Sequence, residues 1–225
     1  MTAELLRSAY RQVPPGLRRA ILVRRRSRYW LAAGILFIHV PKAAGTSFNQ
    51  ALYGRFIGHP HARDVRRWGS RAVNALPSFS VVRNPWDRLV SAYRFARAGR
   101  GVGEGYRAGM WRRHLYQGPE FESFDRFVRQ WLAPKDVGKL DGVFQPQTLF
   151  VCGPGLDPLV DHVGRLEDLA PTYRFIEEAI GTVPAVAKGN RSGESVDYRT
   201  FYTPDLVRVV GEIYRDDVSR FGYDF

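Results

Sequence analysis

Cysteine is almost absent from this chain of 225 residues, which contains only Cys152. A single cysteine excludes an intramolecular disulfide and any zinc site built from several cysteines. The sequence therefore predicts an intracellular, cytoplasmic protein. Cys152 ends the apolar run "TLFVC", which is typical of a small buried core residue, and we assign it no catalytic role.

Long apolar runs are also missing, since no window approaches the roughly 20 apolar residues that a membrane-spanning helix needs. The early stretch "LRRAILVRRRSRYW" mixes arginine with apolar residues but lacks the apolar core and small-residue cleavage site of a secretory signal. We expect residues 1–34 to form a basic lead-in. It is either a solvated helix packed on the domain, which we favour, or a segment that contacts an anionic membrane or glycan.

Acidic residues are too few to balance the basic ones, because 34 Lys and Arg face 22 Asp and Glu, a formal net charge of +12. Most of the basic residues are arginine, whose planar guanidinium makes two-pronged contacts with phosphate and sulfate. We therefore expect an anionic ligand or partner. A nucleotide, an acidic polysaccharide and an anionic membrane all fit this charge, whereas no recognised nucleic-acid module or aromatic ladder supports nucleic acid.

Two strand–turn–helix units stand out in the sequence. In the first, apolar residues 35–40 suit a central strand, and Thr46–Phe56 carries apolar residues at helical spacing. In the second, Phe79–Val82 suits a strand, and Pro85 begins a helix with one apolar face. Such units predict a parallel sheet with helices on its faces. The expected fold is α/β, a P-loop-like three-layer domain with a central parallel sheet over residues 35–225.

Further elements follow along the chain. Helical periodicity returns at Phe121–Leu132, a short strand is expected in "HVGRLEDL", and helices are expected at about Pro171–Ile180 and after the N-cap residue Thr203. Residues 98–120, whose role is undefined, are rich in glycine, arginine and aromatic residues, and the stretch "RAGRGVGEGYRAG", residues 97–109, is predicted to be a mobile loop.

The turn of the first unit, "PKAAGTS", is a candidate anion-binding loop. It lacks the G-x-x-x-x-G-K-[ST] order of nucleoside-triphosphate loops. Small residues nevertheless allow the backbone N–H groups of Ala44, Gly45, Thr46 and Ser47 to converge on an anion at a helix N-terminus. Lys42 would reach over that anion with its charge. The sequence therefore predicts a phosphate cradle with a displaced lysine.

The turn of the second unit predicts another anion site. Arg83 falls at the carboxyl end of its strand, where open parallel sheets place ligands, and Ser91 lies about two turns into the following helix. Together they would hold a second phosphate, although Arg83 would instead pair with Asp87 in a purely structural interpretation. A basic, flexible stretch that contains Arg191 and Ser192 is either a loop that closes over a nucleotide or an ordinary surface loop.

Two segments, "HVPKAAGTSF" and "VVRNPWDRLVSAYRF", resemble the signature segments of the sulfotransferases, in particular the branch that modifies carbohydrates. Shorter pieces agree in order and type, among them "GHPHARDV", "FQPQTLFV" and "VGRLEDL". The resemblance implies that the first segment binds the 5′-phosphosulfate of 3′-phosphoadenosine 5′-phosphosulfate (PAPS). It implies that the second segment binds the 3′-phosphate through an arginine and a serine, here Arg83 and Ser91.

The resemblance also implies a reaction, the transfer of a sulfuryl group from PAPS to a hydroxyl of a carbohydrate or glycolipid acceptor. Lys42 and the neighbouring helix N-terminus would stabilise charge on the leaving phosphate. A histidine follows the first loop by a similar interval in these enzymes, so His59 is the candidate general base, with His61 as the alternative. His39 is predicted to be a structural hydrogen-bonding residue. We expect no metal, since no acidic cluster accompanies the loop.

Two other function classes remain open. A P-loop-type small-molecule kinase would use a similar sheet, but the missing Gly-Lys-Ser order argues against it. A non-catalytic binder of anionic glycan is compatible with the net charge of +12.

Overall fold

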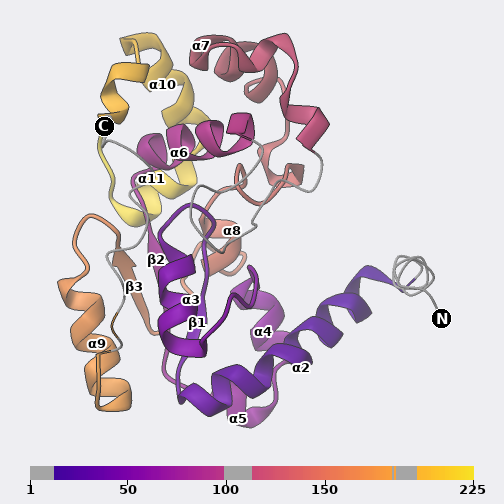
Figure 1. Ribbon diagram of the computed structural model, residues 1–225, viewed down its shortest axis with the longest axis vertical. Helices are drawn as coiled ribbons and strands as arrows, with labels where there is room; N and C mark the ends of the chain where they lie inside the picture. Colours follow the sequence, from indigo (N-terminus) through magenta and orange to yellow (C-terminus); the bar gives the residue numbers. More distant parts are fainter. Residues whose placement is uncertain (1–12, 99–112, 184, 186–196) are drawn as a thin grey trace.

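The computed structural model describes residues 13–98, 113–183, 185 and 197–225. Within these residues the elements follow one another around a small sheet (Figure 1). In chain order they are α2 (Pro15–Ala33), β1 (Leu36–Ile38), α3 (Gly45–Tyr53), α4 (Ala62–Trp68), α5 (Arg71–Asn74), β2 (Ser78–Val82), α6 (Pro85–Ala98), η1 (Arg113–Tyr116), η2 (Pro119–Phe121), α7 (Phe124–Arg126), η3 (Phe127–Leu132), η4 (Val137–Lys139), α8 (Thr148–Val151), β3 (His162–Arg165), α9 (Ala170–Ile180), η5 (Tyr198–Phe201), α10 (Pro204–Ile213) and α11 (Arg215–Phe221).

The sheet has three parallel strands in the order β1-β2-β3. Phe37 lies opposite Phe79, and Phe79 lies opposite His162, which fixes the register. All three strands therefore end at the same edge of the sheet. The α/β fold and the parallel sheet that the sequence predicts are confirmed, and the chain enters the two candidate anion-binding turns at this shared edge.

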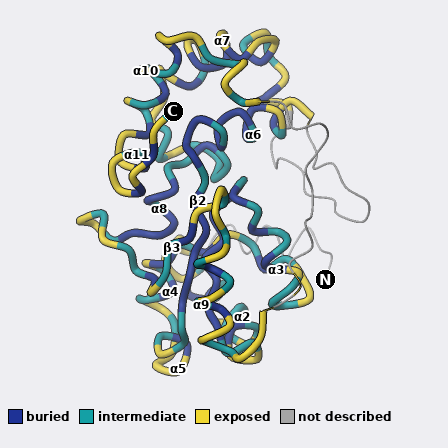
Figure 2. The backbone as a smooth tube through the Cα atoms, turned by 90° about the vertical axis from the view of Figure 1, so that its left-hand side faces the viewer, coloured by how far each residue is buried: buried dark blue, intermediate teal, exposed yellow. Residues whose placement is uncertain are grey.

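Helices cover both faces of the sheet, and alternate strand residues show this directly. On one face, Phe37 and Phe79 pack against Phe48 of α3 and Ile176 of α9. On the other face, strand residues such as Ile38 join a larger core that includes residues of α2, α4 and α6. The sheet is thus the middle of three layers, and Figure 2 shows β2 as a buried strand between them.

The basic segment before β1 forms α2, a helix that packs on α4, α3 and α5. Its Val23 and Trp30 side chains are buried in the core shared with the sheet. This arrangement agrees with the expected helix packed on the domain. None of the helices in the described ranges combines the length and apolar character that crossing a membrane requires.

Three expected helices differ in detail. The helix expected at Thr46–Phe56 ends at Tyr53, because Gly54 adopts a left-handed conformation with φ 65°. The segment expected as a helix at Phe121–Leu132 contains one α-helical turn, and Phe127–Leu132 then forms a π-helix in an aromatic cluster. The last helix is interrupted at Tyr214, which separates α10 from α11.

Two further expectations can be compared with the structure. Cys152 is buried, as predicted, and its burial raises the pKa of its thiol to about 11, so the thiol is inert at neutral pH. Most of the segment expected to form a mobile loop, its residues 99–109, lies outside the described residues.

Candidate active site

The loop between β1 and α3 has an unusual backbone. Lys42 and Ala44 both adopt left-handed conformations, with φ of 69° and 56°, although neither is glycine. Such conformations cost a non-glycine residue of the order of 1 kcal/mol each and persist only where neighbouring groups fix them. The contacts of the loop show which groups do so.

The carbonyl groups of this loop are almost all occupied by hydrogen-bond donors. Arg88 of α6 donates from Nε to the Pro41 carbonyl at 2.9 Å, and Arg83 donates from Nη1 to the Lys42 carbonyl at 3.2 Å. Including these two, donors engage the carbonyls of His39, Val40, Pro41, Lys42, Ala44 and Gly45. The two arginines thus hold consecutive peptide groups of the loop from the neighbouring strand–helix unit.

Most backbone N–H groups of the loop, in contrast, have no acceptor within the described ranges and remain available as donors. Among the described residues, no acceptor is bonded to the backbone N–H of Lys42, Ala44, Gly45 or Thr46. The expectation of free amides at 44–47 needs one correction, because Ser47 N–H donates to the Ala44 carbonyl at 3.2 Å in the first turn of α3. The loop therefore presents donors but few free acceptors, which is the pattern of an anion cradle.

Gly45 is required by the tight approach of the loop to His39. A Cβ atom at position 45 would lie 1.9 Å from Cδ2 of the buried His39 ring. The ring is held by Asn49, whose Nδ2 donates to His39 Nδ1 at 3.0 Å and to the Gly45 carbonyl at 2.8 Å. His39 therefore has the structural role that the sequence predicts, and its packing selects glycine at the start of α3.

Lys42 is largely enclosed, and its ammonium lies 4.3 Å from the ring centroid of Phe95. Burial, together with the positive charges of Arg83 and Arg88, lowers the pKa of this lysine to about 8. Its surroundings therefore disfavour the charged form of the side chain. An anion bound beside it would relieve both effects.

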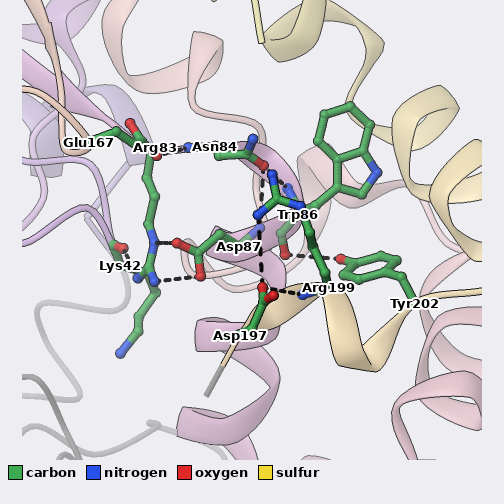
Figure 3. A network of polar contacts seen from close by, with 9 residues as sticks. All are labelled: Lys42, Arg83, Asn84, Trp86, Asp87, Glu167, Asp197, Arg199 and Tyr202. Atoms are coloured by element: carbon green, nitrogen blue, oxygen red, sulfur yellow. Dashed lines mark hydrogen bonds and ion pairs between the residues drawn. The ribbon is translucent and has the colours of Figure 1, made fainter. Parts of the chain in front are cut away.

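Arg83 makes the ion pair with Asp87 that was the structural alternative for this residue. Its Nε and Nη2 donate to the two carboxylate oxygens at 2.8 and 2.6 Å, as Figure 3 shows. With the bond from Nη1 to Lys42, three of the five guanidinium N–H groups are used. One N–H on each Nη remains, so the pair orients the guanidinium and leaves it able to bind an anion.

The backbone of Arg83 is also fixed. Gln147 is fully buried, and its side-chain Oε1 accepts from the Arg83 N–H at 2.9 Å while its Nε2 donates to the Arg83 carbonyl at 2.8 Å. Ser91 lies half-buried on α6, about two turns after Arg83, and its proposed role in anion binding stays a prediction. Arg191 and Ser192 lie outside the described residues.

His59 is held against the same loop. Its Nδ1 lies 3.1 Å from the His39 carbonyl, which can only accept, so Nδ1 carries the proton and Nε2 has a free lone pair. The ring packs on His39 and on Phe56, with centroids 4.1 and 5.3 Å apart, while part of the residue is exposed to solvent. Desolvation by this packing lowers the pKa of His59, and nearby Arg26 and Arg88 add to the effect. The imidazole is therefore neutral at pH 7.

His61, the alternative base, has different surroundings. Its ring packs on Phe150 of α8 with centroids 4.5 Å apart, and partial burial lowers its pKa as well. Both histidines are thus neutral at pH 7. Only His59 bonds to the backbone of the candidate loop.

Two buried charged residues near the site, Arg88 and Asp217, were not predicted from the sequence. Arg88 is only 2% exposed, and besides Pro41 it reaches the Gly142 carbonyl at 3.4 Å. Asp217 is fully buried and accepts from the N–H groups of Gln147 and Thr148 at 2.8 and 2.9 Å. Both lie at inward-facing positions of their helices, α6 and α11, and a charge in register with the buried apolar residues of a helix is a sequence signal that could have identified them.

A family model described as the sulfotransferase family matches residues 32–224. The chain belongs to the sulfotransferase family. The matching model is that of the carbohydrate branch, which agrees with the resemblance of the two signature segments. No curated protein and no solved structure matches the chain.

Membership of this family implies PAPS as the sulfuryl donor. The residues present fit such a molecule, which carries two separated anionic groups. The free amides of the loop, together with Lys42, would suit one anionic group, and the remaining N–H groups of Arg83, at the same edge of the sheet, would suit the other. The hydrogen bond from Arg83 to the Lys42 carbonyl connects these two groups of donors.

The role of Arg88 can be tested by removing its guanidinium. We expect Arg88→Met to lower the free energy of unfolding by about 1.5–3 kcal/mol, because buried carbonyl groups lose a charged donor. It should also weaken binding of adenosine 3′,5′-bisphosphate, since the Pro41 carbonyl then loses its donor and, among the described residues, Arg83 is the one arginine that still holds the loop. Urea unfolding and calorimetry measure the two effects.

The matched control is Arg94→Met, on an exposed position of the same helix. It should change the free energy of unfolding by less than about 0.5 kcal/mol. If Arg88→Met were as stable as this control and bound the bisphosphate normally, Arg88 would have no part in holding the loop.

Proposed function

We propose that this sulfotransferase moves a sulfuryl group from PAPS to a hydroxyl of a carbohydrate or glycoconjugate acceptor. The observation that carries the proposal is the loop before α3, in which carbonyls are occupied, amides are free and Lys42 adds a cation. Donors fixed in this way before the reaction stabilise charge where it develops. PAPS, when bound, supplies the activated sulfuryl group.

Lys42 and the amides of Ala44, Gly45 and Thr46 have the first role in this proposal. As the bond between sulfur and the bridging phosphate oxygen breaks, the electron pair stays with the phosphate. These donors stabilise the resulting negative charge. Arg83 and Ser91 would bind the 3′-phosphate, and the stretch that contains Arg191 and Ser192 would contribute to nucleotide binding.

His59 has the second role. Its free Nε2 accepts the proton of the acceptor hydroxyl while the hydroxyl oxygen forms its bond to sulfur. The hydrogen bond from Nδ1–H to the His39 carbonyl supports this assignment, because it fixes the tautomer that a base requires. The reaction needs no metal in this scheme.

The other expectations from the sequence remain proposals. We infer a single domain over residues 35–225 behind the lead-in 1–34, a cytoplasmic location and no nucleic-acid partner. The rival functions, a P-loop-type kinase and a non-catalytic binder of anionic glycan, predict different outcomes when labelled PAPS is offered with a panel of glycans. Only a sulfotransferase transfers the label to a hydroxyl.

The lowered pKa of Lys42 predicts a pH-dependent affinity. In the free protein this lysine is charged below a pKa of about 8 and neutral above it. Because an anion prefers the charged form, binding of adenosine 3′,5′-bisphosphate should weaken roughly tenfold between pH 7 and pH 9. Calorimetry at a series of pH values measures this change.

The control for this pH series is Lys42→Met, which should bind more weakly and show a nearly flat profile over the same range. A wild-type profile as flat as that of the variant would show that Lys42 does not contact the anion. ATP, which lacks a 3′-phosphate, should bind poorly to the wild type at every pH.

Replacement of His59 separates binding from chemistry. We expect His59→Ala to keep its affinity for the bisphosphate and to lower turnover by roughly 10²–10⁴-fold, because the acceptor proton loses its base. His61→Ala is the matched control and should lower turnover much less. A large loss confined to the His61 variant would transfer the role of base to that residue, and normal turnover in both would exclude a histidine base.

A further inference from the structure

The positive charge of the chain is concentrated in one part of the sequence. Residues 13–86 contain thirteen Lys and Arg but a single acidic residue, Asp64, a difference of +12. The whole chain also has a net charge of +12, so the remaining residues are balanced. This part forms α2 to β2, which lie at the opposite end of the molecule from α7 and α10 (Figure 1).

The outer side of α2 carries a stripe of exposed residues. Leu17 is 54% exposed and Leu31 is 45% exposed, with the exposed Arg24 and Arg28 between them. Their spacings of seven, four and three residues place all four on one side of the helix. The opposite side of α2 is buried against the domain. The stripe spans roughly 21 Å at 1.5 Å per residue.

The arginines of this stripe, and the exposed Arg25 that flanks it, lack acidic partners in the described part of the chain. Among the described residues, no carboxylate pairs with Arg24, Arg25 or Arg28. Arg28 instead donates to the hydroxyl of Tyr29 at 2.6 Å, and Arg55, beyond the end of α3, donates to the same oxygen at 3.1 Å. Two guanidinium groups are thus held around one tyrosine, which concentrates positive charge and favours an anionic partner.

We propose that the α2 face, formed by Leu17, Arg24, Arg25, Arg28 and Leu31, docks on the anionic lipid headgroups of a membrane surface. The arginines supply the attraction to the headgroups, which is worth about 1 kcal/mol for each basic residue near the surface. The two exposed leucines favour a bilayer over a soluble polyanion as the partner. Apolar side chains at both ends of the stripe gain free energy in the boundary between headgroups and acyl chains, and they gain none on a hydrated glycan.

The test is co-sedimentation of the full chain with vesicles of phosphatidylcholine, with and without about 30% phosphatidylglycerol. We expect binding only to the anionic vesicles. The variant Arg24→Gln/Arg25→Gln/Arg28→Gln should bind them about 100-fold more weakly, from about 1 kcal/mol per arginine. Equal binding of the wild type to both vesicle types, or to neither, would overturn the proposal.

A control variant removes the same charge from the other end of the molecule. The side chains of Arg126, Arg129 and Arg208 are exposed on α7, η3 and α10. The variant Arg126→Gln/Arg129→Gln/Arg208→Gln should bind anionic vesicles within about threefold of the wild type, because charge far from the surface is screened. A loss as large as that of the α2 variant would show that net charge alone drives binding, against a defined docking face.

A second variant, Leu17→Gln/Leu31→Gln, tests the bilayer against a soluble polyanion. It should bind anionic vesicles at least tenfold more weakly, because two leucines no longer enter the bilayer. Its binding to dextran sulfate should equal that of the wild type. If its vesicle binding were unchanged while the arginine variant lost vesicles and dextran sulfate alike, the face would serve a soluble polyanion. Unchanged affinity for adenosine 3′,5′-bisphosphate confirms that each variant is folded.

Discussion

The hydrogen bonds from Arg83 and Arg88 to consecutive carbonyl groups of the loop are the interactions on which the candidate site depends. They hold Lys42 and Pro41 from a different strand–helix unit, and they offset the cost of the left-handed residues between β1 and α3. Because the carbonyls are occupied, the free backbone groups of the loop are donors. A loop without a nucleoside-triphosphate motif thereby gains the same capacity to bind an anion.

The electrostatics of the site follow from this arrangement. Burial and the nearby charges of Arg83 and Arg88 lower the pKa of Lys42, and the carboxylate of Asp87 pairs with Arg83. Gathering cations in this way costs free energy in the absence of an anion, which a phosphosulfate would recover on binding. The same helix that carries the surface arginines also supports the segment before His59, the proposed base, since Arg26 of α2 donates to the carbonyl of Ile57.

Local sequence patterns were sufficient for the parts of the site that are local. Apolar strands, Gly45 at a helix start and Arg83 at a strand end could be identified from periodicity and position, and the structure confirms the parallel sheet that they predicted. The contact of Arg88 with Pro41 joins residues far apart in the chain, so spacing alone could not reveal it. The tautomer of His59 likewise depends on a carbonyl twenty residues earlier, and the π-helix depends on aromatic packing.

The central claim is that backbone amides of the loop before α3 bind the anionic donor. A titration of ¹⁵N-labelled protein with adenosine 3′,5′-bisphosphate, followed by ¹H–¹⁵N NMR, tests it most directly. The account predicts that the amide resonances of Ala44, Gly45 and Thr46 shift most and saturate with one common dissociation constant. If these resonances stayed unchanged while those of the α2 arginines shifted, the nucleotide would bind to the basic surface and the loop would not be its site.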